Sequence, residues 1–199
     1  MARPRSPDFE IQREQMLAAA ARLFATQGYT ATTMQQVAQA CGVSKATLYH
    51  YVRDKHGLLV QITQGHVARL EILVAEVQQQ GLGERALLVG LIERFMAAYA
   101  RSQHEHRVLT EDVKFLASDE RSAVLDAQRR VVDAFAQAIV SLRPDLRGAG
   151  RVKPLAMLLF GMMNWTFTWL RPGVALTHET LAPMVADLFL GGLPAVQTA

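Results

Sequence analysis

Several side chains in and around one short stretch of the chain are suited to contact a nucleic acid. Short hydroxyl groups and a lysine at the start of a helix reach base edges or phosphates, whereas a tyrosine and a histidine further along suit the phosphate backbone. A threonine before the stretch and a lysine after it are placed to contact flanking phosphates. The candidate DNA contacts are Thr33, Ser44, Lys45, Thr47, Tyr49, His50 and Lys55.

Two short predicted helices must position these side chains. Thr33 and Gln36 have the spacing of a capping box, which predicts a helix over residues 34–40. Ser44 is a favourable N-cap for a second helix, from Lys45 to about Val52. The exposed hydroxyl, amino and imidazole groups belong to this second helix and its cap.

The turn between these helices has the residues that a steep helix crossing needs. Ala38 provides a small contact surface, and Gly42 accepts the left-handed backbone of the turn. Apolar side chains for the underside come from Val37, Cys41, Val43 and Leu48. Residues 33–52 therefore have the helix-turn-helix pattern, in which the second helix enters the major groove of DNA.

The rest of the sequence predicts an all-α fold of about nine helices. It is rich in helix-forming residues and has no sustained alternation of β-branched residues. Gly28 predicts the end of the first helix, and Asp54 predicts the cap of a long one. Pro183 implies a kink in the last helix or a start nearer Thr180. Besides the two short helices, the expected helices cover residues 8–27, 54 to about 80, 84–102, 105–117, 119–142, 152–170 and 178–190.

Residues 154–170 carry no charge, but they are too few to cross a membrane. The segment has 17 residues, against about 20 for a spanning helix, and polar residues interrupt it. A helix that is apolar on most faces is more often buried in protein. We expect no membrane association, and a homodimer formed through the helices near 152–170 and 178–190.

The distribution of charge and the single cysteine indicate where such a protein works. Residues 1–57 contain seven basic and four acidic side chains, so all of the net charge of +3 lies in this first quarter. Arg3 and Arg5 form a basic arm that is either a solvated tail or a minor-groove contact. Cys41 is the only cysteine, and the first residues do not resemble a signal peptide. We expect a cytoplasmic protein.

Two further stretches connect this chain to a known family. LAAAARLFATQGYTATTM, followed by VAQACGVSKATLYHYVRDKHGLL, resembles the N-terminal domain of TetR-family repressors over residues 12–60. The resemblance implies a homodimer with a DNA-binding domain, residues 1–53, and a ligand-binding and dimerisation domain, residues 54–199. It also implies that the DNA contacts are those named above. Gly57 departs from the family pattern and should loosen the first turn of its helix by roughly 1 kcal/mol relative to alanine.

The C-terminal part of the chain carries a weaker signal for the effector. NWTFTWLRPG, residues 164–173, resembles a subgroup of TetR-like repressors that respond to CoA thioesters. An acyl or aryl group would bind apolar residues, and basic residues would bind the phosphates of CoA. Both tryptophans also fit a core or interface, and the basic run 143–153 also fits a solvated loop. The candidate ligand contacts are Phe95, Tyr99, Phe115, Trp165, Trp169, Arg143 and Arg147.

Other classes of function find little support in the sequence. It contains no phosphate-binding loop, dinucleotide fingerprint or Gly-x-Ser-x-Gly motif, so we expect no enzyme and no cofactor. A cluster of His and carboxylate residues at 104–112 lacks the cysteine ligands common in zinc sites, and we expect no metal.

The interpretation is a repressor that binds a palindromic operator as a dimer. A small-molecule effector, an acyl- or aryl-CoA that controls a catabolic operon, would release it by tilting the helix over 54–80 and changing the spacing of the two recognition helices. Two alternatives stay open. One is a multidrug-type repressor that senses apolar or cationic compounds. The other is a dimeric DNA-binding adaptor without a ligand.

Overall fold

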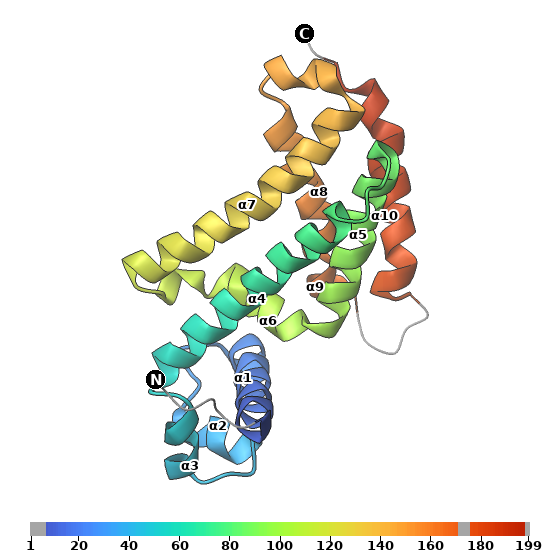
Figure 1. Ribbon diagram of the computed structural model, residues 1–199. Coiled ribbons are helices and arrows are strands. Elements are labelled where there is room, and N and C mark those ends of the chain that lie inside the picture. The colour runs from blue at the N-terminus through green and yellow to red at the C-terminus, as the bar shows by residue number, and fades with distance from the viewer. Residues whose placement is uncertain (1–6, 171–175, 198–199) are drawn as a thin grey trace. The chain divides into compact units, whose positions relative to one another are not determined.

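The computed structural model describes residues 7–170 and 176–197 and is all-helical over these ranges (Figure 1). Nine helices have seven or more residues, α9 is a single turn, and three short 3-10 helices (η) join them, which confirms the all-α expectation. The α-helices are α1 (Pro7–Gln27), α2 (Met34–Ala40), α3 (Lys45–Tyr51), α4 (Lys55–Gln78), α5 (Glu84–Arg101), α6 (Gln103–Glu111), α7 (Ser118–Leu142), α8 (Val152–Asn164), α9 (Thr166–Trp169) and α10 (His178–Gly192). The 3-10 helices are η1 (Val113–Phe115), η2 (Pro144–Gly148) and η3 (Leu193–Ala195).

The N-terminal helices begin and end where the sequence predicts, because nearby side chains and a glycine cap them. Gly28 has a φ of +91°, and its N–H donates to the carbonyl oxygen of Phe24 at 2.9 Å, which ends α1. Thr33 and Gln36 form the expected capping box at the start of α2. At α4, the N–H of Gly57 donates to Asp54 Oδ1 at 2.7 Å, so the predicted cap of this helix is also confirmed.

Two helices differ from the sequence-based expectation. The helix expected over 105–117 begins at Gln103 and ends at Glu111, and a separate η1 follows. The helix expected over 152–170 is divided at Trp165; the hydroxyl of Thr166 donates to the carbonyl oxygen of Met163 at 2.6 Å and competes there with the helical hydrogen bonds. The last helix begins at the expected His178, behind a Thr177–Thr180 capping box, and not nearer Thr180.

The chain forms two compact units. The first comprises residues 1–67 and 104–124, and the second comprises 68–103 and 125–199. Helices α4 and α7 each contribute residues to both units. The predicted domain boundary between residues 53 and 54 stays a prediction.

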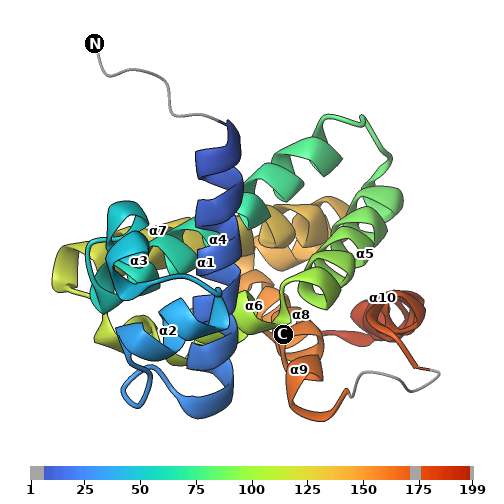
Figure 2. The ribbon, with the colours of Figure 1, turned by 90° about the horizontal axis from the view of Figure 1, so that it is seen from below.

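In the first unit, α2 and α3 pack beside α1 (Figure 2). The side chains of Phe24 and Leu48 are fully buried there. Helix α3 therefore packs against the rest of the first unit through one side, the side of Leu48.

In the second unit, α5 and α10 lie side by side in both views (Figures 1 and 2). The centre of this unit is aromatic. The rings of Phe95 and Phe135 meet edge to face at 4.9 Å between centroids, and Phe160 lies 4.7 Å from Phe135. These three rings join α5, α7 and α8 into one core.

Candidate nucleic-acid interface and effector site

The hydroxyl of Ser44 builds the start of α3. Ser44 Oγ accepts the N–H of Thr47 at 3.0 Å and shares a 2.8 Å hydrogen bond with Thr47 Oγ1. Leu48 points into the first unit and is fully buried. This anchor turns Lys45 and Tyr49 outward, where the amino group of Lys45 lies 5.9 Å from the centroid of the Tyr49 ring. His50 is also exposed, in the last turn.

Gly42 makes the tight turn that precedes this helix. Its φ is +67°, a conformation that side chains other than glycine rarely adopt. The N–H of Val43 then donates to the carbonyl oxygen of Ala38 at 3.0 Å, so the turn closes directly onto α2. Helices α2 and α3 therefore have the arrangement that the helix-turn-helix pattern predicts.

Besides Ser44 and Thr47, the candidate DNA contacts Thr33 and Lys55 also have partners inside the chain. Thr33 is exposed, but its hydroxyl and N–H belong to the capping box of α2. Lys55 donates from Nζ to the carbonyl oxygens of Tyr29 at 2.9 Å and of Thr30 at 3.2 Å. Lys55 thus connects the start of α4 to the α1–α2 loop, a contact that no sequence pattern indicated. That these residues bind DNA stays a prediction.

Cys41 lies beside a hollow of about 300 Å³ between α1 and the α2–α3 turn. Burial raises the pKa of its thiol, and nearby Arg22 opposes this only in part. A thiol with a raised pKa is a poor nucleophile, which agrees with its interpretation as a small apolar contact.

The candidate effector residues do not all lie together. Phe95 and Tyr99 are buried in the second unit, with ring centroids 6.1 Å apart. Burial raises the pKa of the Tyr99 hydroxyl well above its usual range. Trp165 and Trp169 are 66 % and 48 % exposed, and Phe115 belongs to the first unit.

Arg143 is already bound within the chain. Its guanidinium pairs with both carboxylate oxygens of Asp145, at 2.8 and 2.6 Å, and also donates to the carbonyl oxygens of Leu193 and Val196. This pairing raises the pKa of Arg143 and lowers that of Asp145. Arg143 therefore holds the end of the chain around η3, whereas Arg147 is exposed in η2. An effector phosphate at Arg143 would have to compete with Asp145.

Two buried polar atoms in the second unit were not singled out from the sequence. Asn164 Oδ1, at the end of α8, and His178 Nε2, at the start of α10, have no hydrogen-bond partner in the structure. His178 is only 4 % exposed. Buried polar atoms without partners are costly, and they are often satisfied by a ligand or an ordered water. No sequence pattern marks these two atoms, because whether a polar side chain is buried among apolar ones depends on the fold.

Three remaining expectations concern the arm, a metal and a membrane. Arg3 and Arg5, and also Arg171 and Pro172 of the NWTFTWLRPG motif, lie outside the described residues. Over the described ranges, no three His, Cys, Asp or Glu side chains converge as metal ligands would. No helix of the part of the chain that the structure describes is long and apolar enough to cross a membrane.

Comparison with known protein families shows to which family this chain belongs. Residues 16–62 match the family described as bacterial regulatory proteins, tetR family, and residues 81–193 match the tetracyclin repressor-like C-terminal domain. The chain belongs to the TetR family. Members of this family are transcriptional regulators and not enzymes, and they bind DNA through the helix-turn-helix.

Relatives of this TetR-family protein match it over almost its whole length. The HTH-type transcriptional repressor KstR2 of Rhodococcus jostii is 27 % identical over 190 residues, which cover 92 % of this chain and 91 % of KstR2. A TetR-family regulator from Bordetella parapertussis is 31 % identical, with a TM-score of 0.86 over 94 % of this chain and 98 % of that one.

AibR also has this fold. Apo AibR is 26 % identical, with a TM-score of 0.77 over 88 % of this chain and 97 % of its own. AibR has also been crystallised with isovaleryl coenzyme A and operator DNA. That structure has a TM-score of 0.76 at 24 % identity and covers 89 % of this chain and 97 % of its own.

The burial of His178 in the TetR-family protein predicts a specific pH dependence of stability. Burial lowers the pKa of His178 in the folded state, and the neighbouring Glu179 opposes this only in part. The unfolded chain therefore takes up the proton first as the pH falls below about 6.5, so the free energy of unfolding decreases. We expect the melting temperature of the wild type to fall more between pH 8 and pH 5.5 than that of His178→Gln.

The control is His104→Gln, which removes an exposed histidine. Its melting temperature should follow the wild-type pH profile. Each kcal/mol of lost stability lowers the melting temperature by about 2–4 °C for a chain of this size. An identical pH profile for His178→Gln and the wild type would contradict this assignment.

Proposed function

We propose that the protein is a repressor that binds a palindromic operator as a homodimer and is released by an acyl- or aryl-CoA. The observation that carries the DNA-binding part is the outward face of α3. Lys45, Tyr49 and His50 are exposed there, while Leu48 anchors the opposite side. Thr47 is partly exposed between them. Repression is proposed by analogy with KstR2, which is named as a repressor.

The dimer is proposed to form through an apolar face of α8 and α10, which contact each other in the second unit. The side chains of Leu158 on α8 and Leu188 on α10 are 64 % and 68 % exposed. Met157 on α8 and Met184 on α10 are also exposed, at 53 % and 52 %. Such a concentration of exposed apolar side chains marks an interaction surface. A symmetric four-helix contact would cover it and provide two recognition helices.

The effector is proposed to be a CoA thioester that binds in the second unit. The apolar side chains of Phe95 and Tyr99 would surround its acyl or aryl part, and Asn164 or His178 would satisfy a polar group of it. Exposed Arg147 and Lys153 would bind the phosphates of CoA. The complex of AibR with isovaleryl coenzyme A and operator DNA supports a ligand of this class for the shared fold.

The DNA-binding proposal predicts two different effects within α3. An operator is first selected by the wild type from a library of random duplexes, and we expect an inverted repeat. Tyr49→Phe removes one hydroxyl and should weaken binding to selected and random duplexes alike, by about tenfold, with an unchanged salt dependence because no charge is lost. Lys45→Ala should instead reduce the preference for the selected duplex by about tenfold or more.

Fluorescence anisotropy over a salt series measures both effects. The control is Arg85→Ala, which removes one exposed positive charge from the second unit and should leave both affinities unchanged. Failure of the wild type to enrich any sequence would reject an operator-binding function. Equal effects of Tyr49→Phe and Lys45→Ala on the two duplexes would contradict the division of roles.

The dimer proposal predicts that one charge on the α8–α10 surface separates the subunits. Leu158→Glu would bury an unpaired carboxylate in the interface, which costs about 3–5 kcal/mol and raises the dimer dissociation constant at least a hundredfold. Sedimentation should show a wild-type dimer and a Leu158→Glu monomer at micromolar concentration. Ile72→Glu, at an α4 side chain that is 57 % exposed, should stay dimeric. A monomeric wild type would contradict the proposal.

The effector proposal predicts release by thioesters and not by their free acids. The acids lack the phosphates of CoA, and each lost contact with a charged group costs about 1.5–3 kcal/mol. Titration of the protein–operator complex with acyl- and aryl-CoA compounds, the free acids and cationic dyes measures release. Release by dyes alone would support the multidrug-type alternative. Release by no compound would support the adaptor.

A further inference from the structure

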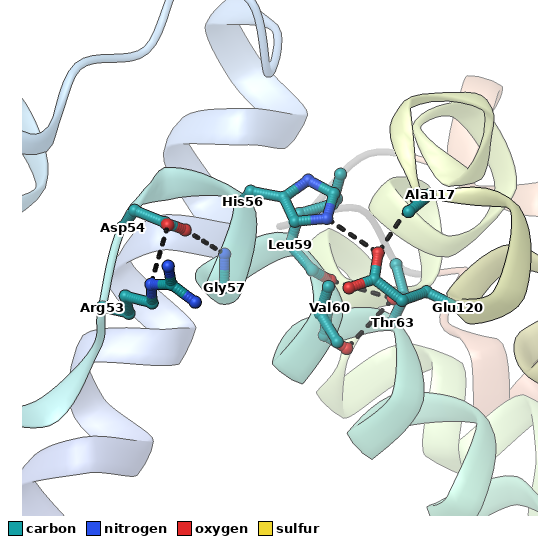
Figure 3. A network of polar contacts seen from close by, with 9 residues as sticks. All are labelled: Arg53, Asp54, His56, Gly57, Leu59, Val60, Thr63, Ala117 and Glu120. Atoms are coloured by element: carbon teal, nitrogen blue, oxygen red, sulfur yellow. Dashed lines mark hydrogen bonds and ion pairs between the residues drawn. The ribbon is translucent and has the colours of Figure 1, made fainter.

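In the first unit, a side-chain hydrogen bond joins the start of α4 to the start of α7. His56 Nε2 lies 2.7 Å from Glu120 Oε2, and both side chains are partly buried (Figure 3). The same oxygen accepts the N–H of Ala117 at 3.0 Å, so Glu120 also caps α7 (Figure 3). The capping bond fixes the carboxylate, and His56 then meets an acceptor that is already oriented.

An aromatic contact joins the α1–α2 loop to η1 in the same unit. The centroids of the Tyr29 and Phe115 rings are 5.2 Å apart. Tyr29 also meets Phe24 of α1 edge to face at 5.1 Å. The amino group of Lys55 lies 4.6 Å from the centroid of the Tyr29 ring while it donates to the Tyr29 carbonyl oxygen. Tyr29 is therefore held from α1, α4 and η1 at once.

Together these contacts define a clamp made of Tyr29, Lys55, His56, Phe115 and Glu120. It joins both chain segments that flank the helix-turn-helix: the α1–α2 loop before α2, and the first turn of α4 after α3. The remaining side of the clamp, residues 115–120, leads into α7. Since α7 continues into the second unit, the non-covalent contacts of residues 115–120 connect the head (α1–α3) to that unit, in addition to the covalent connection through α4.

Charged groups surround the aromatic contact between Tyr29 and Phe115. Burial first, and then the carboxylates of Asp54, Asp112 and Glu120, raise the pKa of the Tyr29 hydroxyl, which stays neutral. Lys55 and Lys114 place positive charge over the two rings of the aromatic contact.

We propose that this clamp holds the α1–α2 loop and the first turn of α4 in the conformation that binds the operator. His56 and Glu120 are positioning residues, because they orient the helix-turn-helix without touching DNA. Residues 115–120 thereby provide a second link, besides α4, between the head and the effector-binding unit. The inference rests on the proposed operator binding.

The test uses two substitutions that differ only in where they place a hydrogen-bond donor. The side-chain amide of Gln reaches the position of His Nε2, whereas that of Asn reaches only the position of Nδ1. His56→Asn should therefore weaken binding to the selected duplex about threefold to tenfold, and His56→Gln should restore most of the wild-type affinity. Arg107→Ala, which breaks the exposed Arg107–Glu111 pair of α6, is the control and should bind like the wild type.

Hydrogen exchange of the full-length protein without DNA gives a second readout. We expect faster exchange of the amides at residues 29–33 in His56→Asn than in His56→Gln or Arg107→Ala. The aromatic side of the clamp is tested by Phe115→Ala, which should have the same two effects, and by Phe115→Leu, which should have smaller ones.

The outcomes separate this inference from the proposed function. A wild type that selects no operator rejects the proposed function. A wild type that binds its operator, with His56→Asn equal to it in affinity and in exchange, overturns the clamp. A loss of affinity that His56→Gln does not recover assigns His56 to packing alone and also overturns it.

Discussion

The DNA-binding face depends on the packing that holds α3. Seven residues are too few to form a stable helix in water, because the cost of the first turn is recovered only over a longer helix. Three features stabilise this short helix instead: the Ser44 cap, the left-handed turn at Gly42 and the burial of Leu48. Since the same features set which side of α3 is exposed, the orientation of Lys45 and Tyr49 follows from the stability of the helix.

The second constraint is that α4 and α7 each belong to both compact units. A helix transmits displacement because its backbone hydrogen bonds resist bending. The two helices are joined by polar contacts in each unit, His56 to Glu120 in the first and Glu71 to Arg130 at 2.6 Å in the second. Polar contacts near the surface contribute little to stability, so these two matter mainly for the positions of the helices that they join. A regulator of this kind needs a connection that is ordered and also easily shifted.

The second unit combines two surfaces with different requirements. Its interior is closed by Phe95, Phe135 and Phe160, yet it contains buried polar atoms at Asn164 and His178. Its exterior exposes the leucines of α8 and α10, which water does not favour. A ligand for the interior and a second subunit for the exterior would each remove an unfavourable feature.

The sequence by itself determined the helix-turn-helix and most helix ends, because these depend on interactions within a few residues. The Thr33 capping box, the Ser44 and Asp54 caps and the stop at Gly28 all follow from side chains close to the backbone groups that they satisfy. The sequence pattern of the helix-turn-helix was specific enough to indicate the family.

Only the tertiary structure decided which distant groups meet. Lys55 binds the loop 26 residues before it, Arg143 binds a carbonyl 50 residues after it, and Phe115 lies against Tyr29. Sequence patterns had suggested DNA or effector contacts for these three residues, since a charged or aromatic side chain has the same appearance in sequence whether its partner is a ligand or the chain itself. The partner of each of these side chains can be identified only once the fold shows which distant segments pack together.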